Sequence, residues 1–216
     1  MQKKAILFDL DGVLVTTDDC HCRAWKQMAD EERIPFTRTD NERLRGVSRM
    51  ASLEIVLEKA ARAYSEEEKL ELAERKNRYY VQLIRKLTDA AILPGARETV
   101  IRLREVGVLT AVASSSKNAR LILTQVGLLD LFDTIVDGTQ ITKSKPDPEV
   151  FLKAAELLHK NPQDCIVVED ADAGIAAAKS AGMYAVAVGN AHGGDLHCSG
   201  LTSVDLLELA AGEGTK

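Results

Sequence analysis

Side chains that could act on a phosphate ester follow apolar runs at four places in the chain. These places are Asp9 with Asp11, Ser114 to Asn118, Lys145, and Glu169 with Asp170. Carboxylates are hard oxygen ligands that suit Mg²⁺, which also keeps water and phosphate oxygens. A lysine supplies positive charge for an anion, and a hydroxyl with backbone N–H groups near a helix start can bind a phosphoryl group. The four places together suit phosphoryl transfer through an aspartyl phosphate.

Each grouping alone has an ordinary structural explanation. Ser114 could equally cap a helix, and Lys145 could be a solvated loop lysine. Glu169 and Asp170 could be an acidic pair that the helix dipole favours at a helix start. Asp9 and Asp11 could lie in a solvated turn. All four groupings in this order, each after an apolar run, favour a functional site instead.

Alternating strands and helices are predicted to position these groups. Strands are expected at Ile6–Phe8 and at 108–113, 134–136, 165–168 and 184–188, with helices at 94–106, 118–126, 148–158 and 172–181. Asp172 is expected to cap the last of these helices. This alternation predicts a parallel sheet covered on both faces, with its strand ends meeting at one edge. Asp9 and Asp11 would share one face while the chain stays extended, and Gly12 would allow the turn after them.

A helical insertion interrupts this pattern after the first strand. Leu53, Val56, Leu57, Ala60 and Ala61 have the spacing of one apolar helix face. Ser65 and Glu68 form a capping-box pattern at the start of a long helix. The predicted organisation is an α/β core domain at 1–16 and 89–216 with a helical domain at 17–88. That domain could be a plain helical subdomain, but its place after the acidic strand favours a lid.

The composition and net charge limit the kinds of partner that the protein is expected to bind. The chain has 216 residues and a net charge of −5, so nucleic acid is not expected as a partner. No apolar stretch approaches the roughly 20 residues of a membrane span, so a cytoplasmic location is expected. A monomer is expected because the sequence has no obvious exposed apolar stripe. The four cysteines are expected to stay reduced, and Cys20-His21-Cys22 lacks the second ligand pair of a zinc site. Residues 192–200 are expected to form a surface loop.

The order of these motifs resembles the haloacid dehalogenase superfamily of phosphohydrolases and phosphomutases over essentially the whole chain. The resemblance implies a Rossmann-like core with an inserted α-helical cap. It implies that Asp9 is the nucleophile and Asp11 the general acid and base. One Mg²⁺ per site would bind Asp9, Glu169, Asp170 and the backbone carbonyl of Asp11. The transferring phosphoryl group would be held by Ser114, Ser115 and Lys145.

Within that superfamily, segments of the cap and one segment of the core resemble the β-phosphoglucomutases. The cap segments are His21 to Trp25, Leu44 to Arg49, Ser52-Leu53 and Lys76-Asn77, and the core segment is Ser114 to Asn118. By resemblance, a second, non-transferring phosphate would bind Arg49, Ser116, Lys117 and Asn118, and the sugar would lie against Gly46, Val47, Ser48 and Ser52. The residues that would position the lid are Thr17, His21, Trp25 and Lys76, with Trp25 expected to pack in the core of the lid.

The resemblance implies interconversion of β-D-glucose 1-phosphate and D-glucose 6-phosphate, with β-glucose 1,6-bisphosphate as priming intermediate. Two alternatives stay open: a Mg²⁺-dependent sugar-phosphate phosphatase with a leakier lid, and a non-catalytic module that binds phosphorylated ligands. The chain departs from the family pattern at Val15, where threonine is common, and at Thr16, where aspartate is usual. Both departures lie near the expected hinge.

Overall fold

The computed structural model describes residues 4–44 and 47–212. The chain divides into two compact units: the first runs to Thr16 and resumes at Thr88, and the second spans Thr17–Leu87. Thr88 therefore groups with the first unit, whereas the predicted insertion ran to residue 88.

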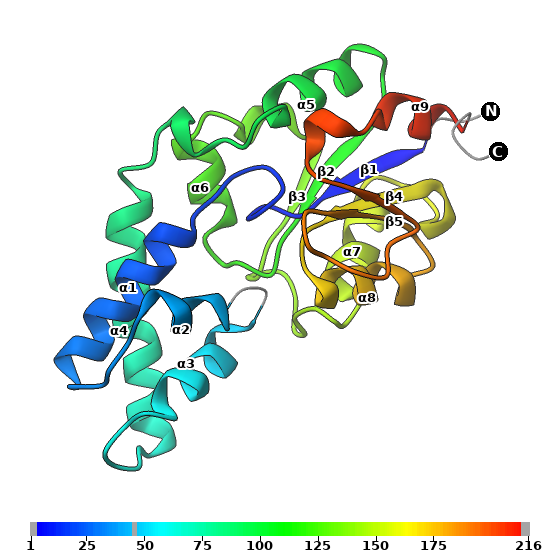
Figure 1. Cartoon of the computed structure of the whole chain (residues 1–216). Helices are drawn as coiled ribbons and strands as arrows, with labels where there is room; N and C mark the ends of the chain where they lie inside the picture. The colour runs from blue at the N-terminus through cyan, green and yellow to red at the C-terminus, as the bar shows by residue number, and fades with distance from the viewer. Residues whose placement is uncertain (1–3, 45–46, 213–216) are drawn as a thin grey trace. The chain divides into compact units, whose positions relative to one another are not determined.

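A parallel sheet forms the centre of the first unit, as the alternating pattern predicts (Figure 1). Its strand order is β3-β2-β1-β4-β5-β6, and every neighbouring pair is parallel. The strands are β1 (Ala5–Phe8), β2 (Thr110–Ala113), β3 (Thr134–Val136), β4 (Cys165–Glu169), β5 (Tyr184–Val188) and β6 (Leu196–Cys198). The central strands are buried along their length because helices cover both of their faces.

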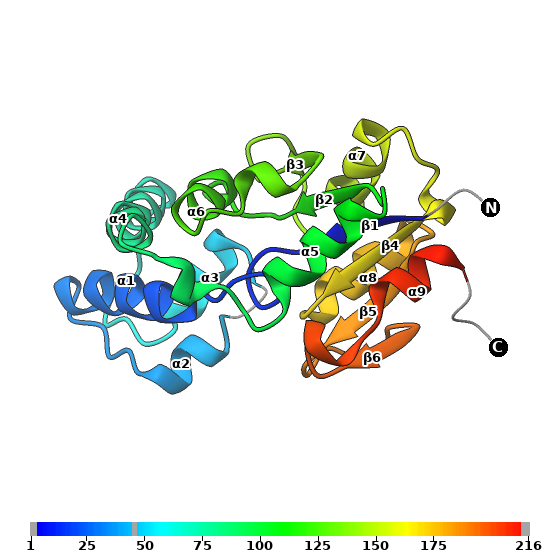
Figure 2. The ribbon, with the colours of Figure 1, turned by 90° about the horizontal axis from the view of Figure 1, so that it is seen from above.

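The helices of this unit lie in two layers (Figures 1 and 2). They are α5 (Ala96–Glu105), α6 (Ala119–Gln125), α7 (Glu149–Leu157), α8 (Asp172–Ser180) and α9 (Leu206–Ala211), with 3₁₀ turns at Asp89–Ala91, Leu129–Leu131, Pro162–Asp164 and Leu201–Ser203. Helices α7 and α8 cover one face of the sheet, where Phe151 and Ile175 pack against Leu7 and Val167. Helices α5 and α9 cover the opposite face.

Two predictions about this unit are wrong. The segment expected to be a loop contains β6, an edge strand in which Leu196 pairs with Val186 of β5. The N-cap of α8 is Ala171, and the Asp172 side chain instead accepts a hydrogen bond from the His192 backbone N–H at 2.7 Å. Strand β1 ends at Phe8, the expected last residue, and Asp9 and Asp11 follow it.

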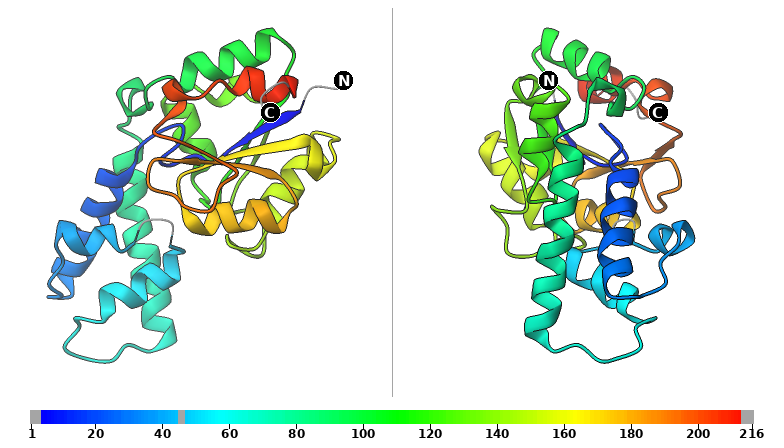
Figure 3. Two further views of the ribbon diagram at one scale, coloured as in Figure 1. Left: turned by 45° about the vertical axis from the view of Figure 1, so that its right-hand side comes forward. Right: turned by 90° about the vertical axis from the view of Figure 1, so that its left-hand side faces the viewer.

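The helices of the second unit, over its described residues, are α1 (Asp18–Glu31), α2 (Arg38–Glu42), α3 (Arg49–Leu57) and α4 (Glu66–Ile84). Helices α1 and α4 run side by side (Figure 3). The predicted capping box begins α4: the Glu68 backbone N–H donates to Ser65 Oγ at 3.2 Å, and the Ser65 N–H donates to the Glu68 carboxylate at 2.7 Å. Helix α3 ends at Leu57, so Ala60 and Ala61 do not extend its apolar face as predicted.

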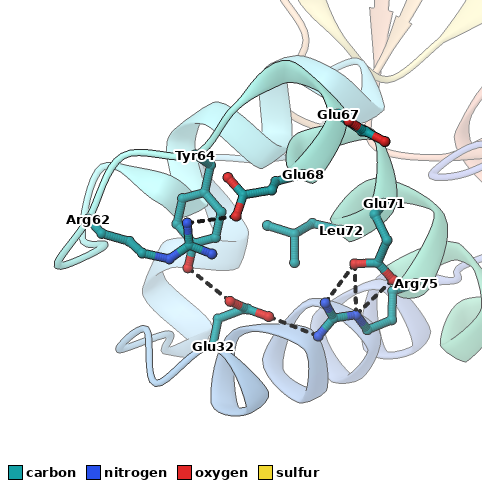
Figure 4. Close-up of a pocket in the computed structure, with 8 residues that line it drawn as sticks. All are labelled: Glu32, Arg62, Tyr64, Glu67, Glu68, Glu71, Leu72 and Arg75. Carbon is teal, nitrogen blue, oxygen red and sulfur yellow. Dashed lines mark hydrogen bonds and ion pairs between the residues drawn. The ribbon is translucent and has the colours of Figure 1, made fainter.

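An ion-pair network joins the end of α1 to α4 (Figure 4). The Arg75 guanidinium lies 2.6 Å from Glu71, 2.9 Å from Glu32 and 3.2 Å from Glu31. The network lines a pocket of about 290 Å³, in which Tyr64 also donates to Glu32 at 3.0 Å. These charges are paired across two elements, so they stabilise the helical unit. Among the described residues, no helix combines the length and apolar character that crossing a membrane requires.

Candidate active site

Asp9 and Lys145 meet where the central strands end. Phe8 of β1 pairs with Val112 of β2 and with Val168 of β4, so the residues after these strands lie at one edge of the sheet. The Asp9 backbone N–H donates to the Val168 carbonyl at 2.9 Å, which fixes Asp9 at this edge. The carboxylate of Asp9 accepts a hydrogen bond from the Lys145 ammonium.

Lys145 joins the ends of three strands. Its ammonium donates to the Ala113 carbonyl at 3.0 Å and lies 3.4 Å from Glu169 Oε1, in addition to its contact with Asp9. The side chains of Lys145 and Asp9 are 8% and 13% exposed. A buried ammonium is costly unless it is paired, so the contacts with two carboxylates account for its place in the fold.

Three acids converge beside this ammonium. Oxygen atoms of Asp9, Glu169 and Asp170 all lie within 4.8 Å of one another. This group does not include the carboxylate of Asp11. The predicted binding of Mg²⁺ by the backbone carbonyl of Asp11 stays a prediction. Asp11 directly precedes the turn that begins at Gly12, whose N–H donates to the Val15 carbonyl at 2.8 Å.

The charges of this cluster oppose one another. Burial and the neighbouring Asp9 carboxylate raise the pKa of Glu169 well above its usual range. Burial, together with Asp9 and Asp11, raises the pKa of Asp170 to about 7. Burial works against the charge of Lys145, but Asp9 and Glu169 outweigh it and raise the pKa of the ammonium. The single positive charge of Lys145 does not balance the three carboxyl groups, which repel one another when ionised. Their hard oxygen donors, grouped in this way, fit a divalent cation such as Mg²⁺.

The loop after β2 brings hydroxyl groups to the same edge. The Ser114 N–H donates to the Val136 carbonyl at 3.0 Å, and Ser114 Oγ accepts from the Ser116 N–H at 3.2 Å. Ser114 does not cap α6, because that helix begins at Ala119 with Asn118 as its N-cap. Among the described residues, Ser115 Oγ is buried with no hydrogen-bond partner. A buried hydroxyl in that state would gain from a ligand oxygen.

The helical unit holds its own polar cluster around Lys76, which is 3% exposed. The Lys76 ammonium lies 2.8 Å from His21 Nδ1, and 4.7 Å from the ring centroids of both Trp25 and Tyr80. Tyr80 Oη lies 2.9 Å from the hydroxyl of Thr17, and its ring stacks against His21 at 4.1 Å. Burial, with Lys76 and Arg49 nearby, holds the pKa of His21 well below its usual range, so the imidazole is neutral.

Arg49 begins α3 in the same unit. Its guanidinium donates to Asn77 Oδ1 at 3.0 Å, and burial lowers its pKa. Ser48 caps this helix by accepting from the Ala51 N–H at 3.4 Å, and the Ser52 hydroxyl donates to the Val47 carbonyl at 3.4 Å. Gly46, predicted at the sugar site, lies outside the described residues.

Residues 3–182 match the family described as "Hydrolase: haloacid dehalogenase-like hydrolase". The chain belongs to the haloacid dehalogenase-like hydrolases. It is 49% identical over 188 residues to a protein named β-phosphoglucomutase from Bacillus subtilis strain 168, covering 86% of this chain and 83% of that protein.

Solved and curated relatives of this haloacid dehalogenase-like chain extend the comparison. A crystal structure of β-phosphoglucomutase from Clostridium difficile superposes with a TM-score of 0.86 at 40% identity, covering 97% of this chain and 96% of that one. The phosphorylated carbohydrates phosphatase of Thermotoga maritima is 31% identical over 183 residues, covering 83% of this chain and 82% of that protein. Both names concern proteins that act on sugar phosphates.

Sequence reasoning missed several partners that this haloacid dehalogenase-like fold supplies. The Ala113 carbonyl holds Lys145, and Tyr80 contacts Thr17, His21 and Lys76. A signal for Tyr80 was available, because a residue four positions after Lys76 lies on the same helix face. The contact of Lys145 with Asp9 spans 136 residues and leaves no trace in sequence spacing.

Proposed function

We propose that the protein is a phosphomutase that interconverts β-D-glucose 1-phosphate and D-glucose 6-phosphate. The observation that carries this proposal is Asp9 at the end of β1, in contact with Lys145 and grouped with Glu169 and Asp170. The identity to the B. subtilis β-phosphoglucomutase supports the choice of reaction.

Asp9, Glu169 and Asp170 would hold Mg²⁺, with the backbone carbonyl of Asp11 as a further ligand. When bound, Mg²⁺ would offset negative charge on the transferring phosphoryl group, an effect worth several kcal/mol in such sites. The Lys145 ammonium, in contact with the Asp9 carboxylate, would offset the same negative charge. Ser114 and Ser115 would donate hydrogen bonds to the phosphoryl oxygens.

The reaction uses Asp9 twice. Phosphorylated Asp9 transfers its phosphoryl group to the 6-hydroxyl of β-glucose 1-phosphate, and Asp11 takes the hydroxyl proton. The product is β-glucose 1,6-bisphosphate, which turns around in the site. Asp9 then attacks the 1-phosphate, and Asp11 returns the proton to the leaving oxygen at C1. Glucose 6-phosphate leaves, and Asp9 is phosphorylated again.

The bisphosphate needs an anchor for the phosphate that is not reacting. We propose Arg49 for this role, since a guanidinium offers a planar fork to phosphate oxygens. Further contacts would come from Ser116, Lys117 and Asn118, and the sugar would lie against Gly46, Val47, Ser48 and Ser52.

We propose that the helical unit serves as a lid that keeps water from the aspartyl phosphate during turnover. In this proposal Thr17 lies at the hinge, and His21, Trp25 and Lys76 position the lid. Their mutual contacts within the helical unit support a single rigid cluster.

A sugar-phosphate phosphatase is the second candidate, favoured by the 31% identity to the T. maritima phosphatase. One assay separates the two. The protein receives β-glucose 1-phosphate, Mg²⁺ and a trace of β-glucose 1,6-bisphosphate, and both glucose 6-phosphate and inorganic phosphate are followed. A mutase forms glucose 6-phosphate with little phosphate release. Phosphate release at a matching rate would favour the phosphatase, and no Mg²⁺-dependent turnover would favour a non-catalytic binding module.

We also propose that the protein works as a cytoplasmic monomer. The net charge of −5 argues against nucleic acid as a partner, whereas a small anionic substrate is compatible with it if a few cations are concentrated at the site. Light scattering of the purified protein tests the oligomeric state.

A further inference from the structure

We propose that Gly174 is a positioning residue of the metal site: its missing side chain leaves the space in which the Glu169 carboxylate lies. This inference deepens the proposed function, because it rests on Glu169 as a Mg²⁺ ligand. It assigns a role to a glycine outside the groups that touch substrate or metal.

The space at Gly174 is already occupied by Glu169. A Cβ added to Gly174 would lie 1.6 Å from Glu169 Oε1, 2.1 Å from Cδ and 2.2 Å from Cγ. Gly174 is the third residue of α8, a helix in which alanine is the preferred small residue. The helical backbone does not require glycine there, so the requirement comes from the contact with Glu169.

Glu169 cannot move aside and keep its contacts. Its Oε1 lies 3.4 Å from the Lys145 ammonium, and its Oε2 accepts a hydrogen bond from the Asp170 N–H at 3.1 Å. The residue is 2% exposed, so it is packed on its remaining sides. An alanine at position 174 would displace the flexible carboxylate end rather than backbone, which predicts a folded protein with a misplaced ligand.

Gly12 leaves space for the side chain of Asp170 in the same way. A Cβ on Gly12 would lie 1.9 Å from Asp170 Oδ2 and 2.3 Å from Asp170 Cγ. At Gly12 the backbone φ is +89°, so a substitution there is also strained by its conformation. Gly174 is free of that complication and is the position to test.

The first measurement is Mg²⁺ affinity, by calorimetric titration of the metal-free protein. Gly174→Ala should weaken Mg²⁺ binding by about 10- to 100-fold, the range seen when a group that orients a metal ligand is lost. Gly200→Ala is the matched control, because no atom lies within 4 Å of a Cβ there, and it should bind Mg²⁺ like the wild type.

The second measurement is the midpoint of thermal unfolding without metal, for Gly174→Ala in two backgrounds. With Glu169 present the alanine should lower the midpoint. In the Glu169→Ala background it should leave the midpoint unchanged or raise it, because the obstructing carboxylate is gone and alanine favours the helix. The comparison of the two backgrounds remains a test of the inference even if Gly174→Ala alone folds poorly.

Three results overturn the inference. Wild-type Mg²⁺ affinity in Gly174→Ala would do so, and so would an equal loss of midpoint in both backgrounds; either leaves the proposed function standing. A wild-type protein that binds no Mg²⁺ overturns the proposed function, and this inference with it.

Discussion

Lowering the pH should destabilise the helical unit through His21. Burial, Lys76 and Arg49 hold the pKa of this imidazole well below 6.5, so the folded protein keeps it neutral. The unfolded chain takes up the proton at its ordinary pKa of about 6.5. Because the unfolded state then binds more protons than the folded state, stability falls as the pH falls below about 6.5.

The size of this effect follows from proton linkage. At pH 5.5 an unfolded histidine with a pKa of about 6.5 is mostly protonated, which favours unfolding by about 1.4 kcal/mol, against about 0.2 kcal/mol at pH 7.0. His21 should therefore cost the protein about 1.2 kcal/mol over this range while the folded imidazole stays neutral. The raised pKa values of Glu169 and Asp170 act in the opposite direction, because the metal-free folded protein holds those protons more tightly.

Comparison of the wild type with His21→Gln isolates the histidine, since the acids titrate in both proteins. Urea unfolding at pH 7.0 and 5.5, followed by the fluorescence of Trp25, reports directly on this unit because Trp25 is the sole tryptophan and is 2% exposed. The wild type should lose about 1.2 kcal/mol more than His21→Gln on acidification. His192→Gln, at a side chain that is 83% exposed, is the control for loss of an imidazole outside the helical unit. An identical pH dependence in the wild type and His21→Gln would refute the reasoning.

Three further substitutions test the chemistry and the packing. Asp9→Asn should abolish both mutase and phosphatase turnover, measured by glucose 6-phosphate and phosphate formation, and retained turnover would remove Asp9 as nucleophile. Arg49→Ala should slow mutase cycling by about 10- to 100-fold, the worth of a charge-assisted phosphate contact, and reduce phosphate release much less; equal losses would argue against a distal anchor. Arg75→Leu should lower the free energy of unfolding by about 1–2 kcal/mol by leaving Glu32 without its ion-pair partner, whereas the exposed Arg78→Leu should cost under about 0.5 kcal/mol. Equal urea midpoints for these last two variants would contradict a structural role for the network.

The sequence predicted the central sheet because its strands are short and mostly apolar, with polar residues at or soon after their ends. It failed at β6, a three-residue edge strand in which only Cys198 is buried. So short an exposed segment, preceded by Gly193 and Gly194, has the composition of a loop. Its strand character comes from pairing with β5, which local pattern does not encode.

The acidic cluster could be predicted for the same reason as the sheet: Asp9 directly follows β1 and Glu169 ends β4, and those strands are neighbours. The contacts of Gly174 and of the Ala113 carbonyl could not, because they depend on the packing of α8 and of the Lys145 loop against those strand ends. The prediction that Asp172 caps α8 was wrong for a similar reason, because the Asp172 carboxylate accepts a hydrogen bond from the His192 backbone N–H. Residue types identified the chemistry, and tertiary contacts decided the geometry.

The most direct test of the account is to find the phosphoryl group on Asp9. The protein is exposed to β-glucose 1,6-bisphosphate with Mg²⁺, quenched, and treated with borohydride, which reduces an aspartyl phosphate to homoserine. Peptide mass spectrometry should show homoserine at position 9, dependent on the bisphosphate and absent from Asp9→Asn. Homoserine at another aspartate, or none at position 9 while glucose 6-phosphate still forms, would contradict a reaction through Asp9.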